Sequence, residues 1–451
     1  MVIHGKHIRR VESDAPALTV RPHWHPLTRI AFRFSFLYFT LLCLLYTPIP
    51  LALLGVLGRY AGPWGTPLTN PVTTWVGRTF FGVDAVLHTD SGAGDQAAMW
   101  VLACCLLVVS AAVVAVWTAV DRRGAYPRLL AWFTLLLRVC LGGQMLSFGF
   151  AKLIPTQMPG PTLAQLLEPY GHLSPASVLW LQVGSSFPYE MALGAVEVVA
   201  GLLLFVPRTA VLGSAVSLAS MAQVLLTNMA FDIPEKLLAL HLLAMSMVLL
   251  APYARRLFDV FARQRACEPL RPPALFADRR RNRIALVAQL LLCLWVVVNG
   301  YDRWDVWQRQ YGPDSPKSEL YGIWDVQDFA LDGASVPPLI TDETRWQRLV
   351  FDDPGAATYQ RMNGELVPAH AEFRANGEFE LTTTADPSGR TADAAPPFAR
   401  LSAEQPNPDQ LVLHGSLRGH PITITLERVD LDSFTLRNRG FHWVQDYPYF
   451  R

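Results

Sequence analysis

The chain has 451 residues, of which 51% are hydrophobic and 17% charged, and its mean hydropathy is +0.24. Soluble globular proteins carry about 25% charged residues, so the composition excludes an ordinary soluble protein and is typical of a membrane protein. The net charge of +1 conceals a division: residues 1–300 hold 24 Lys and Arg against 14 Asp and Glu, whereas residues 301–451 hold 14 against 23. The first part is predicted to be a basic membrane region and the second an acidic, water-exposed domain.

Two further classes are disfavoured by sequence pattern. No basic run is interleaved with aromatic residues, which argues against a nucleic-acid partner. The six cysteines all precede residue 301, and none lies in a CxxC or CxxCH motif. Covalent haem, zinc ribbons and dithiol redox motifs are therefore unsupported, and no spacing of ligand residues indicates a metal site.

Seven apolar stretches are long enough, or nearly so, to cross a bilayer, which takes about 20 residues. We place them at 30–57, 97–120, 128–151, 186–207, 209–229, 235–251 and 283–300. The first is too long for one simple span, and we expect it to bend at Pro48 and Pro50 and then to follow the membrane interface. About thirty residues rich in Arg and His precede it, so it is expected to be an uncleaved anchor.

The distribution of basic residues predicts the orientation of these spans. Segments 1–33, 121–128, 207–209 and 252–283 together hold 19 Lys and Arg, whereas 58–96, 151–177 and 230–236 together hold four. Basic loops stay in the cytoplasm, so we expect an inner (plasma) membrane protein with a cytoplasmic N-terminus and a periplasmic or extracytoplasmic C-terminal domain.

The expected organisation is multi-domain: a polytopic α-helical membrane bundle followed by an all-β barrel or sandwich. Its segments are a basic cytoplasmic arm (1–29), two N-terminal spans with an outer interfacial loop (30–127), a four-helix membrane bundle (128–256), an Arg-rich cytoplasmic loop (257–282), a last span (283–300) and a β-rich outer domain (301–451). The aromatic and proline-rich loops 63–81 and 155–181 are expected to lie in the membrane interface or to form a lid over a ligand entrance.

Beyond Gly300 the pattern changes from helical to alternating, most clearly over residues 422–427. The other predicted strands lie at 322–331, 346–351, 358–367, 377–384, 398–403, 411–418 and 434–444. Turn pairs such as Asp332-Gly333, Asn363-Gly364, Asn376-Gly377 and Arg418-Gly419 separate them. About eight antiparallel strands favour a small up-and-down barrel or a sandwich.

The first of these strands opens with Gly322-Ile323-Trp324. With Arg437 or Arg439 on the last strand, it resembles the lipocalin-like arrangement in which a first-strand tryptophan packs against a late arginine. A closed barrel of this kind implies either a cavity for an apolar ligand or an interior filled by side chains.

Charged residues inside the predicted spans are the main candidates for function, because ionisable groups are rare in membranes. Residues 138, 142, 145, 149 and 152 share one face of the third span, which carries the cations Arg138 and Lys152. Residues 190, 194, 197 and 201 share one face of the fourth span, which carries Glu190 and Glu197. The glycines on both faces favour close helix packing. The rise per residue predicts an Arg138–Glu197 pair and a Lys152–Glu190 pair.

Other polar residues are expected at the same outer depth. Asn228 and Asp232 follow the fifth span, and Glu235, Lys236 and His241 begin the sixth. Asp232, Glu235 and Lys236 are expected to be solvated residues at helix ends, whereas His241 either titrates or donates a hydrogen bond to a carbonyl. With Lys152 and Glu190, these residues predict an outer polar pocket.

The segment from Arg138 to Lys152, RVCLGGQMLSFGFAK, resembles the first helix of the DoxX family. The segment from Glu190 to Leu204, with the basic turn at Arg208, is similar to its second helix. Four spans over about 128–251 would form the family's bundle. The resemblance implies a bacterial or archaeal membrane protein, and some members of the family are linked to quinone-dependent redox chemistry.

On this basis we expect a DoxX-like membrane protein that takes part in quinone-linked redox chemistry or supports a membrane oxidoreductase. Lys152, Glu190 and His241 are the candidate catalytic residues, which would handle protons or a quinone carbonyl. The candidate cofactor-binding residues are Arg138, Glu197 and Asn228. The expected partners are membrane lipids, a quinone and a redox partner protein. The alternative is a non-enzymatic module that binds or transports a lipid or other apolar molecule through its bundle and barrel.

Overall fold

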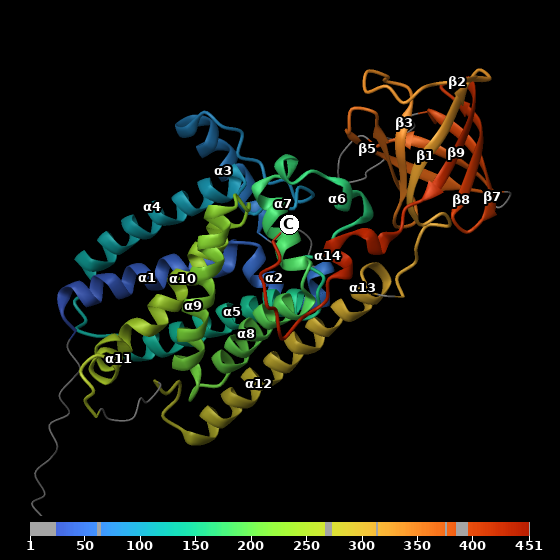
Figure 1. Cartoon of the computed structure of the whole chain (residues 1–451). Helices are drawn as coiled ribbons and strands as arrows, with labels where there is room; N and C mark the ends of the chain where they lie inside the picture. Colours follow the sequence, from blue (N-terminus) through green and yellow to red (C-terminus); the bar gives the residue numbers. More distant parts are fainter. Residues whose placement is uncertain are drawn as a thin grey trace, which may run out of the picture.

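The computed structural model describes residues 24–60, 65–266, 273–312, 314–374, 377–384 and 396–450 (Figure 1). Most of the basic arm, together with Trp64, Cys267 and Asn376, lies outside these residues. Within them, seven helices are long and apolar enough to cross a membrane, as predicted. They are α1 (Pro26–Leu45), α4 (Ala97–Val120), α5 (Pro127–Leu153), α8 (Phe187–Phe205), α9 (Ala210–Ala230), α10 (Lys236–Leu250), which continues into α11 (Ala254–Phe261), and α12 (Arg279–Tyr301), which continues into α13 (Arg303–Gln310).

Shorter helices fill the connections between these seven. They are α2 (Pro48–Leu54), α3 (Thr66–Val76), α6 (Leu163–Leu167) and α7 (Pro175–Gly184). The predicted bend in the first apolar stretch is confirmed, because α1 ends at Leu45 and α2 begins at Pro48 after an extended Tyr46. Proline fits the first turn of a helix, because backbone N–H groups there have no acceptor within the helix and the N–H that proline lacks is not needed.

The closest helix packing in the bundle joins α5 and α8, and the predicted glycine faces produce it. A Cβ atom built on Gly194 would lie 2.6 Å from the carbonyl oxygen of Gly149, and one built on Gly201 would lie 3.1 Å from that of Gly142. Helices in a membrane gain little from burying apolar side chains, because lipid tails are equally apolar. Their association therefore depends on such close contact. The two glycine faces therefore fix the register of α5 against α8.

We expect Gly194→Ala to destabilise the bundle by about 1–3 kcal/mol, because its methyl group would overpack the α5–α8 contact. That methyl carbon would lie 2.3 Å from the backbone nitrogen of Leu153, where neither backbone can yield cheaply. Thermal unfolding of the full chain in detergent measures the effect. Gly171→Ala is the control, since a Cβ there meets nothing within 4 Å. Equal midpoints for both variants would contradict the close-packing account.

The C-terminal domain is a closed antiparallel β-barrel, which decides between the barrel and sandwich predictions. Eight strands follow one another around it, and β1 pairs with β9 to close the ring, while the short β2 pairs with β1 outside it. The strands are β1 (Gly322–Leu331), β2 (Ala334–Ser335), β3 (Trp346–Phe351), β4 (Ala356–Arg361), β5 (Leu366–Phe373), β6 (Glu378–Thr383), β7 (Ala399–Asn407), β8 (Gln410–Leu417) and β9 (His420–Arg428).

Two of the predicted strands are wrong. The predicted strand 358–367 is a hairpin in the structure, with β4 and β5 joined by a turn at Asn363-Gly364, where Gly364 has φ +90°. The predicted strand 434–444 is not a strand: it begins with the short helix α14 (Thr435–Asn438) and then has no regular structure. The eighth strand of the barrel is therefore β5, in which Pro368 takes an exposed position.

Inward-facing side chains fill the barrel, including the predicted alternating set Ile422, Ile424 and Leu426. Trp324 belongs to this core. The arginine beside it is Arg428 on β9, whose guanidinium carbon is 5.9 Å from the indole centroid. The prediction that Arg437 or Arg439 packs against Trp324 is wrong, because both arginines follow β9 and are exposed. Strand β9 itself supplies the arginine because Trp324 and Arg428 are paired in register.

The second aromatic loop connects the bundle to the barrel. The backbone N–H of Leu163, at the start of α6, donates to Oδ2 of Asp352 at 2.6 Å, just after β3. Leu163 packs on Ile323 and Val350 in a small apolar cluster. The end of the bundle that carries α6 and α7 is called the barrel-proximal end below, and the opposite end, which carries the basic loops, the barrel-distal end (Figure 1).

Candidate functional site

A cavity of about 340 Å³ opens at the barrel-proximal end of the bundle, and we call it the Lys152 pocket. Helices α5, α7, α8, α9 and the start of α10 enclose it. Its polar lining residues are Lys152, Gln157, Gln182, Tyr189, Gln223, Thr227, Asn228 and Glu235; the others include Phe148, Met158, Trp180, Val183 and Phe231. An apolar cavity with a few converging polar groups is the usual form of a small-molecule site.

The wall formed by α5 and α8 contains a buried ion pair. Nζ of Lys152 lies 2.7 Å from Oε2 of Glu197, and the two side chains are 8% and 3% exposed. Ser220 donates a longer hydrogen bond of 3.4 Å to Oε1 of Glu197, and the lysine nitrogen lies 5.6 Å from the centroid of the Phe148 ring. One charge of each sign is thereby held in a low-dielectric environment, where breaking the pair is costly.

The predicted pairing of Lys152 with Glu190 and of Arg138 with Glu197 is wrong. Arg138 donates instead to the backbone carbonyl of Leu204 and to Oε1 of Gln289, and Glu190 accepts from the backbone of Met158. Side chains on a helix tilt toward its N-terminus. The prediction used only the rise per residue along the helix axis and did not include this tilt. Lys152 and Arg138 therefore reach toward the barrel-distal end and Glu190 toward the barrel-proximal end, which brings Lys152 to Glu197.

Glu190 has a structural partner in the connection that follows α5. Its Oε1 accepts the Met158 N–H at 3.0 Å, and the side chain is fully buried. Its other oxygen, Oε2, has no hydrogen-bond partner among the described residues. Glu190 does not line the Lys152 pocket, although Met158 does. The carboxyl group fixes the chain that forms one wall.

His241 lies on another face of α10 and does not line the pocket. Its Nδ1 is 2.7 Å from the carbonyl oxygen of Leu237, and its Nε2 is 2.6 Å from the hydroxyl of Tyr38 on α1. Because a carbonyl only accepts, Nδ1 carries the proton and Nε2 accepts the Tyr38 hydroxyl. Of the two predicted roles, the hydrogen bond to a carbonyl is confirmed.

Glu235 is the pocket residue whose role the sequence missed. It was expected to be a solvated helix-end residue, yet it is only partly exposed and lines the pocket beside Asn228, whose Nδ2 donates to the Glu235 carbonyl at 3.1 Å. Burial, and then the nearby charge of Asp95, raise the pKa of Glu235 to about 7. Asp95 itself accepts the Lys236 and Leu237 N–H groups at the start of α10, which a helix dipole favours.

The raised pKa of Glu235 predicts a pH dependence of stability. A carboxyl group whose pKa is higher in the folded than in the unfolded state stabilises the fold below its unfolded pKa, and this stabilisation is lost as the pH rises through about 7. We therefore expect the melting temperature in detergent to fall as the pH rises from about 5 to about 7 and to level off above that. Glu235→Gln should flatten that fall, whereas Glu343→Gln, at an exposed position before β3, should not. An unchanged slope in Glu235→Gln would contradict the assignment.

The loop 155–181, predicted as an interfacial segment or a lid, covers the pocket. Trp180 on α7 lines it and donates from Nε1 to the Gln157 carbonyl at 3.0 Å. The sequence missed Arg33 on α1 as well, which is fully buried and donates to Thr118, to the Asp121 carbonyl and to the Tyr126 hydroxyl at the barrel-distal end. Its partners lie at least 85 residues away in the chain, so no local pattern indicates them.

Over the described residues, the fold defines a class: a bundle of seven apolar helices, each long enough to cross a membrane, that carries a closed eight-stranded β-barrel. Among known proteins, the chain is similar to the uncharacterized protein YwoB of Bacillus subtilis (strain 168). The two are 28% identical over 127 residues, which are 28% of this chain and 80% of YwoB. No family model matches the chain, and no solved structure matches it.

Proposed function

We propose that the chain is a DoxX-like inner-membrane protein that binds a quinone in the Lys152 pocket and supports a membrane redox partner. The observation that carries the proposal is the buried Lys152–Glu197 pair, whose lysine lines a mostly apolar cavity. Such a cavity suits a ligand whose body is apolar and whose carbonyl oxygens accept hydrogen bonds. On this proposal the basic barrel-distal loops lie in the cytoplasm and the barrel in the periplasm.

Several polar groups in and next to the pocket have distinct roles on this proposal. The side-chain nitrogen of Lys152 and the Asn228 amide would donate to the quinone carbonyls, and Glu197 would orient the lysine. Reduction of a quinone takes two electrons, from the redox partner, and two protons. Glu235, with a pKa of about 7, would exchange one of these protons near neutral pH. Glu190 would position the Met158 wall, and His241 would hold α10 against α1.

The alternative carrier function would place an apolar ligand in the barrel as well as in the bundle. The barrel interior is packed with aromatic and aliphatic side chains: Phe351, Phe373 and Phe379 lie with ring centroids 5.1–5.8 Å apart. The geometry therefore favours the bundle pocket as the ligand site.

Quinone content measures the proposal directly. Mass spectrometry of an organic extract from protein purified in mild detergent should find about one quinone per chain. Gln223→Trp, which places an indole at the exposed mouth of the pocket, should lower that ratio severalfold. Leu226→Trp is the matched control, because Leu226 is exposed on the same helix and does not line the pocket.

Two results would overturn the quinone proposal. One is an extract that holds phospholipid but no quinone, which would favour the carrier alternative. The other is an equal quinone ratio in both tryptophan variants, which would place any bound quinone elsewhere.

A further inference from the structure

We propose that a second cavity, at the barrel-distal end of the bundle, binds the anionic head of a membrane amphiphile through Arg138 and Arg208. This site shares no lining residue with the Lys152 pocket and is independent of the quinone proposal. Its ligand is defined by chemistry: a phosphate or carboxylate head attached to an apolar chain.

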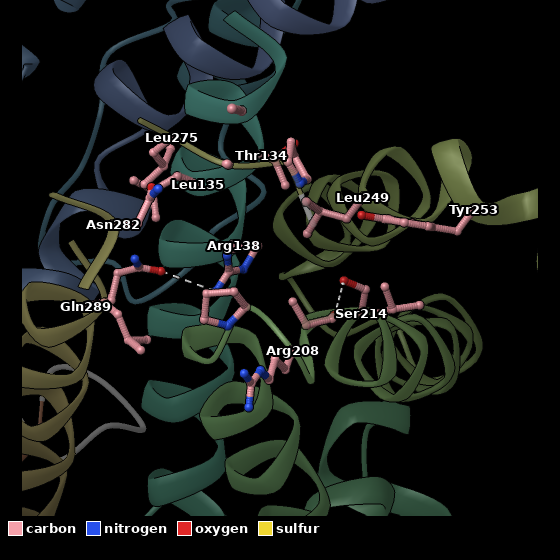
Figure 2. Close-up of a pocket in the computed structure, with 17 residues that line it drawn as sticks. Thr134, Leu135, Arg138, Arg208, Ser214, Leu249, Tyr253, Leu275, Asn282 and Gln289 are labelled. Atoms are coloured by element: carbon pink, nitrogen blue, oxygen red, sulfur yellow. Dashed lines mark hydrogen bonds between the residues drawn. The ribbon is translucent and has the colours of Figure 1, made fainter. Parts of the chain in front are cut away.

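The cavity has a volume of about 320 Å³ and is called the Arg138 pocket (Figure 2). It lies between α5, the turn from α8 to α9, the ends of α9 and α10, and α12. Its polar lining residues are Thr134, Arg138, Arg208, Ser214, Tyr253, Asn282 and Gln289. None of its seventeen lining residues is an aspartate or glutamate.

Arg138 is a buried cation without an anionic partner in the described part of the chain. Arg138 is 6% exposed, and its Nε donates to the carbonyl oxygen of Leu204 at 2.9 Å. One terminal nitrogen, Nη2, donates to Oε1 of Gln289 at 3.3 Å, as the dashed line in Figure 2 shows. Both acceptors are neutral, so the full positive charge is left uncompensated at the cavity wall.

Arg208 adds a second guanidinium to the same cavity. It is exposed at the turn between α8 and α9, and among the residues described it takes part in no ion pair or hydrogen bond. A buried charge is strongly disfavoured unless an opposite charge or several hydrogen bonds compensate it. The buried Arg138, with Arg208 beside it in a cavity whose described lining holds no carboxylate, therefore suits an external anion, and the planar guanidinium matches the oxygens of a carboxylate or phosphate.

An apolar groove continues from the Arg138 pocket and accounts for the rest of the ligand. This groove, of about 440 Å³, runs between α5 and α12 and shares Leu135, Leu275 and Gln289 with the pocket. Its further lining is Trp132, Val139, Phe276, Ile284, Leu292 and two alanines, and Arg281 is its single charged residue. A head held by Arg138 and Arg208 could thus extend an acyl chain along the groove, where the apolar contact stabilises it.

Lipid titration of the full chain in neutral detergent, followed by native mass spectrometry, tests the proposal. The probes are phosphatidylglycerol, phosphatidylcholine with the same acyl chains, a fatty acid and inorganic phosphate. At least one anionic amphiphile should bind about tenfold more tightly than phosphatidylcholine, the effect of one hydrogen-bonded charge pair. Tighter binding of phosphatidylglycerol than of fatty acid would assign a phosphate head, and the reverse a carboxylate head.

Three arginine variants separate this site from general surface charge. Arg138→Gln and Arg208→Gln should each reduce the preference for the anionic amphiphile severalfold. Arg283→Gln should leave it unchanged, since Arg283 is exposed on α12 and lines neither cavity. Because Arg208 is exposed, its variant decides the test even where Arg138→Gln lowers the yield of folded protein.

Several results would overturn the inference. Equal binding of anionic and zwitterionic lipid by the wild-type chain would remove the anion site. A preference that survives Arg208→Gln in full, or that falls as far in Arg283→Gln, would assign the attraction to the general surface charge. Inorganic phosphate binding as tightly as phosphatidylglycerol would remove the groove from the site.

Discussion

Replacement of Lys152 by methionine is expected to lower the free energy of unfolding of the bundle by about 3–5 kcal/mol, because it leaves the buried carboxylate of Glu197 unpaired. The pair is tight, at 2.7 Å, and both side chains are almost fully buried. Methionine keeps the length and apolar contacts of the lysine stem, so the change isolates the charge. The measurement is chemical or thermal unfolding of the full chain in detergent.

A double-mutant cycle makes this prediction specific. Lys152→Met combined with Glu197→Gln should recover part of the lost stability, since no unpaired charge is left. The matched control is Arg78→Met: Arg78 pairs with Asp84 at 3.0 Å, but the two side chains are 65% and 61% exposed, and such surface pairs contribute about 0–1 kcal/mol. Strictly additive effects in the cycle would show that Lys152 and Glu197 are not energetically coupled.

This pair also separates structural from functional roles in the proposed quinone site. If the double variant is as stable as the wild type but has lost its quinone, the charges serve the ligand as well as the bundle. If it retains quinone, the pair serves only to hold α5 against α8. The Asn228 amide is then the remaining proposed donor of a hydrogen bond to the quinone carbonyls.

Replacement of Trp324 by alanine is expected to destabilise the barrel by about 3–5 kcal/mol, the usual cost of removing a large aromatic side chain from a core. The indole is 1% exposed, and its Nε1 donates to the Leu320 carbonyl at 2.9 Å. It also supports the guanidinium of Arg428 on the strand that closes the barrel. Loss of the ring therefore removes apolar contacts at the point where β1 and β9 meet.

Near-ultraviolet circular dichroism of the full chain during unfolding measures this effect. Trp324→Phe should lie between the wild type and the alanine variant, because phenylalanine keeps much of the ring but loses the hydrogen bond to Leu320. Trp443→Ala is the control: Trp443 is 91% exposed, and a surface change of this kind should stay within about 0.5 kcal/mol. A similar small effect of Trp324→Ala would contradict the role of Trp324 in barrel closure.

The bundle and the barrel differ in what they offer a ligand. In the bundle, charged groups adjoin cavities at both ends. In the barrel, the inward positions are occupied by packed aliphatic and aromatic side chains, and the contacts around Asp352 and Leu163 tie the barrel to the bundle. We therefore assign the binding functions to the bundle.

The sequence alone determined the features that depend on local pattern and on the solvent. Seven apolar stretches indicated seven long helices because a bilayer requires that length and polarity. The glycine faces of α5 and α8 and the turns at Asp332-Gly333 and Arg418-Gly419 follow from spacing and backbone preference, and both are confirmed. The alternation over residues 422–427 likewise identified an inward and an outward face of β9.

Only the tertiary structure decided which residues meet. The partner of Lys152 depends on the tilt of side chains and on a register that four glycines set, and the partner of His241 lies 203 residues away. The burial of Glu235 depends on the chain segment around Asp95. The packing of four helices gives Arg138 a cavity in which no described lining residue is a carboxylate. Local pattern specifies the polarity of each face, but contacts between distant segments set the burial and charge balance of a site, because these are properties of the packed chain.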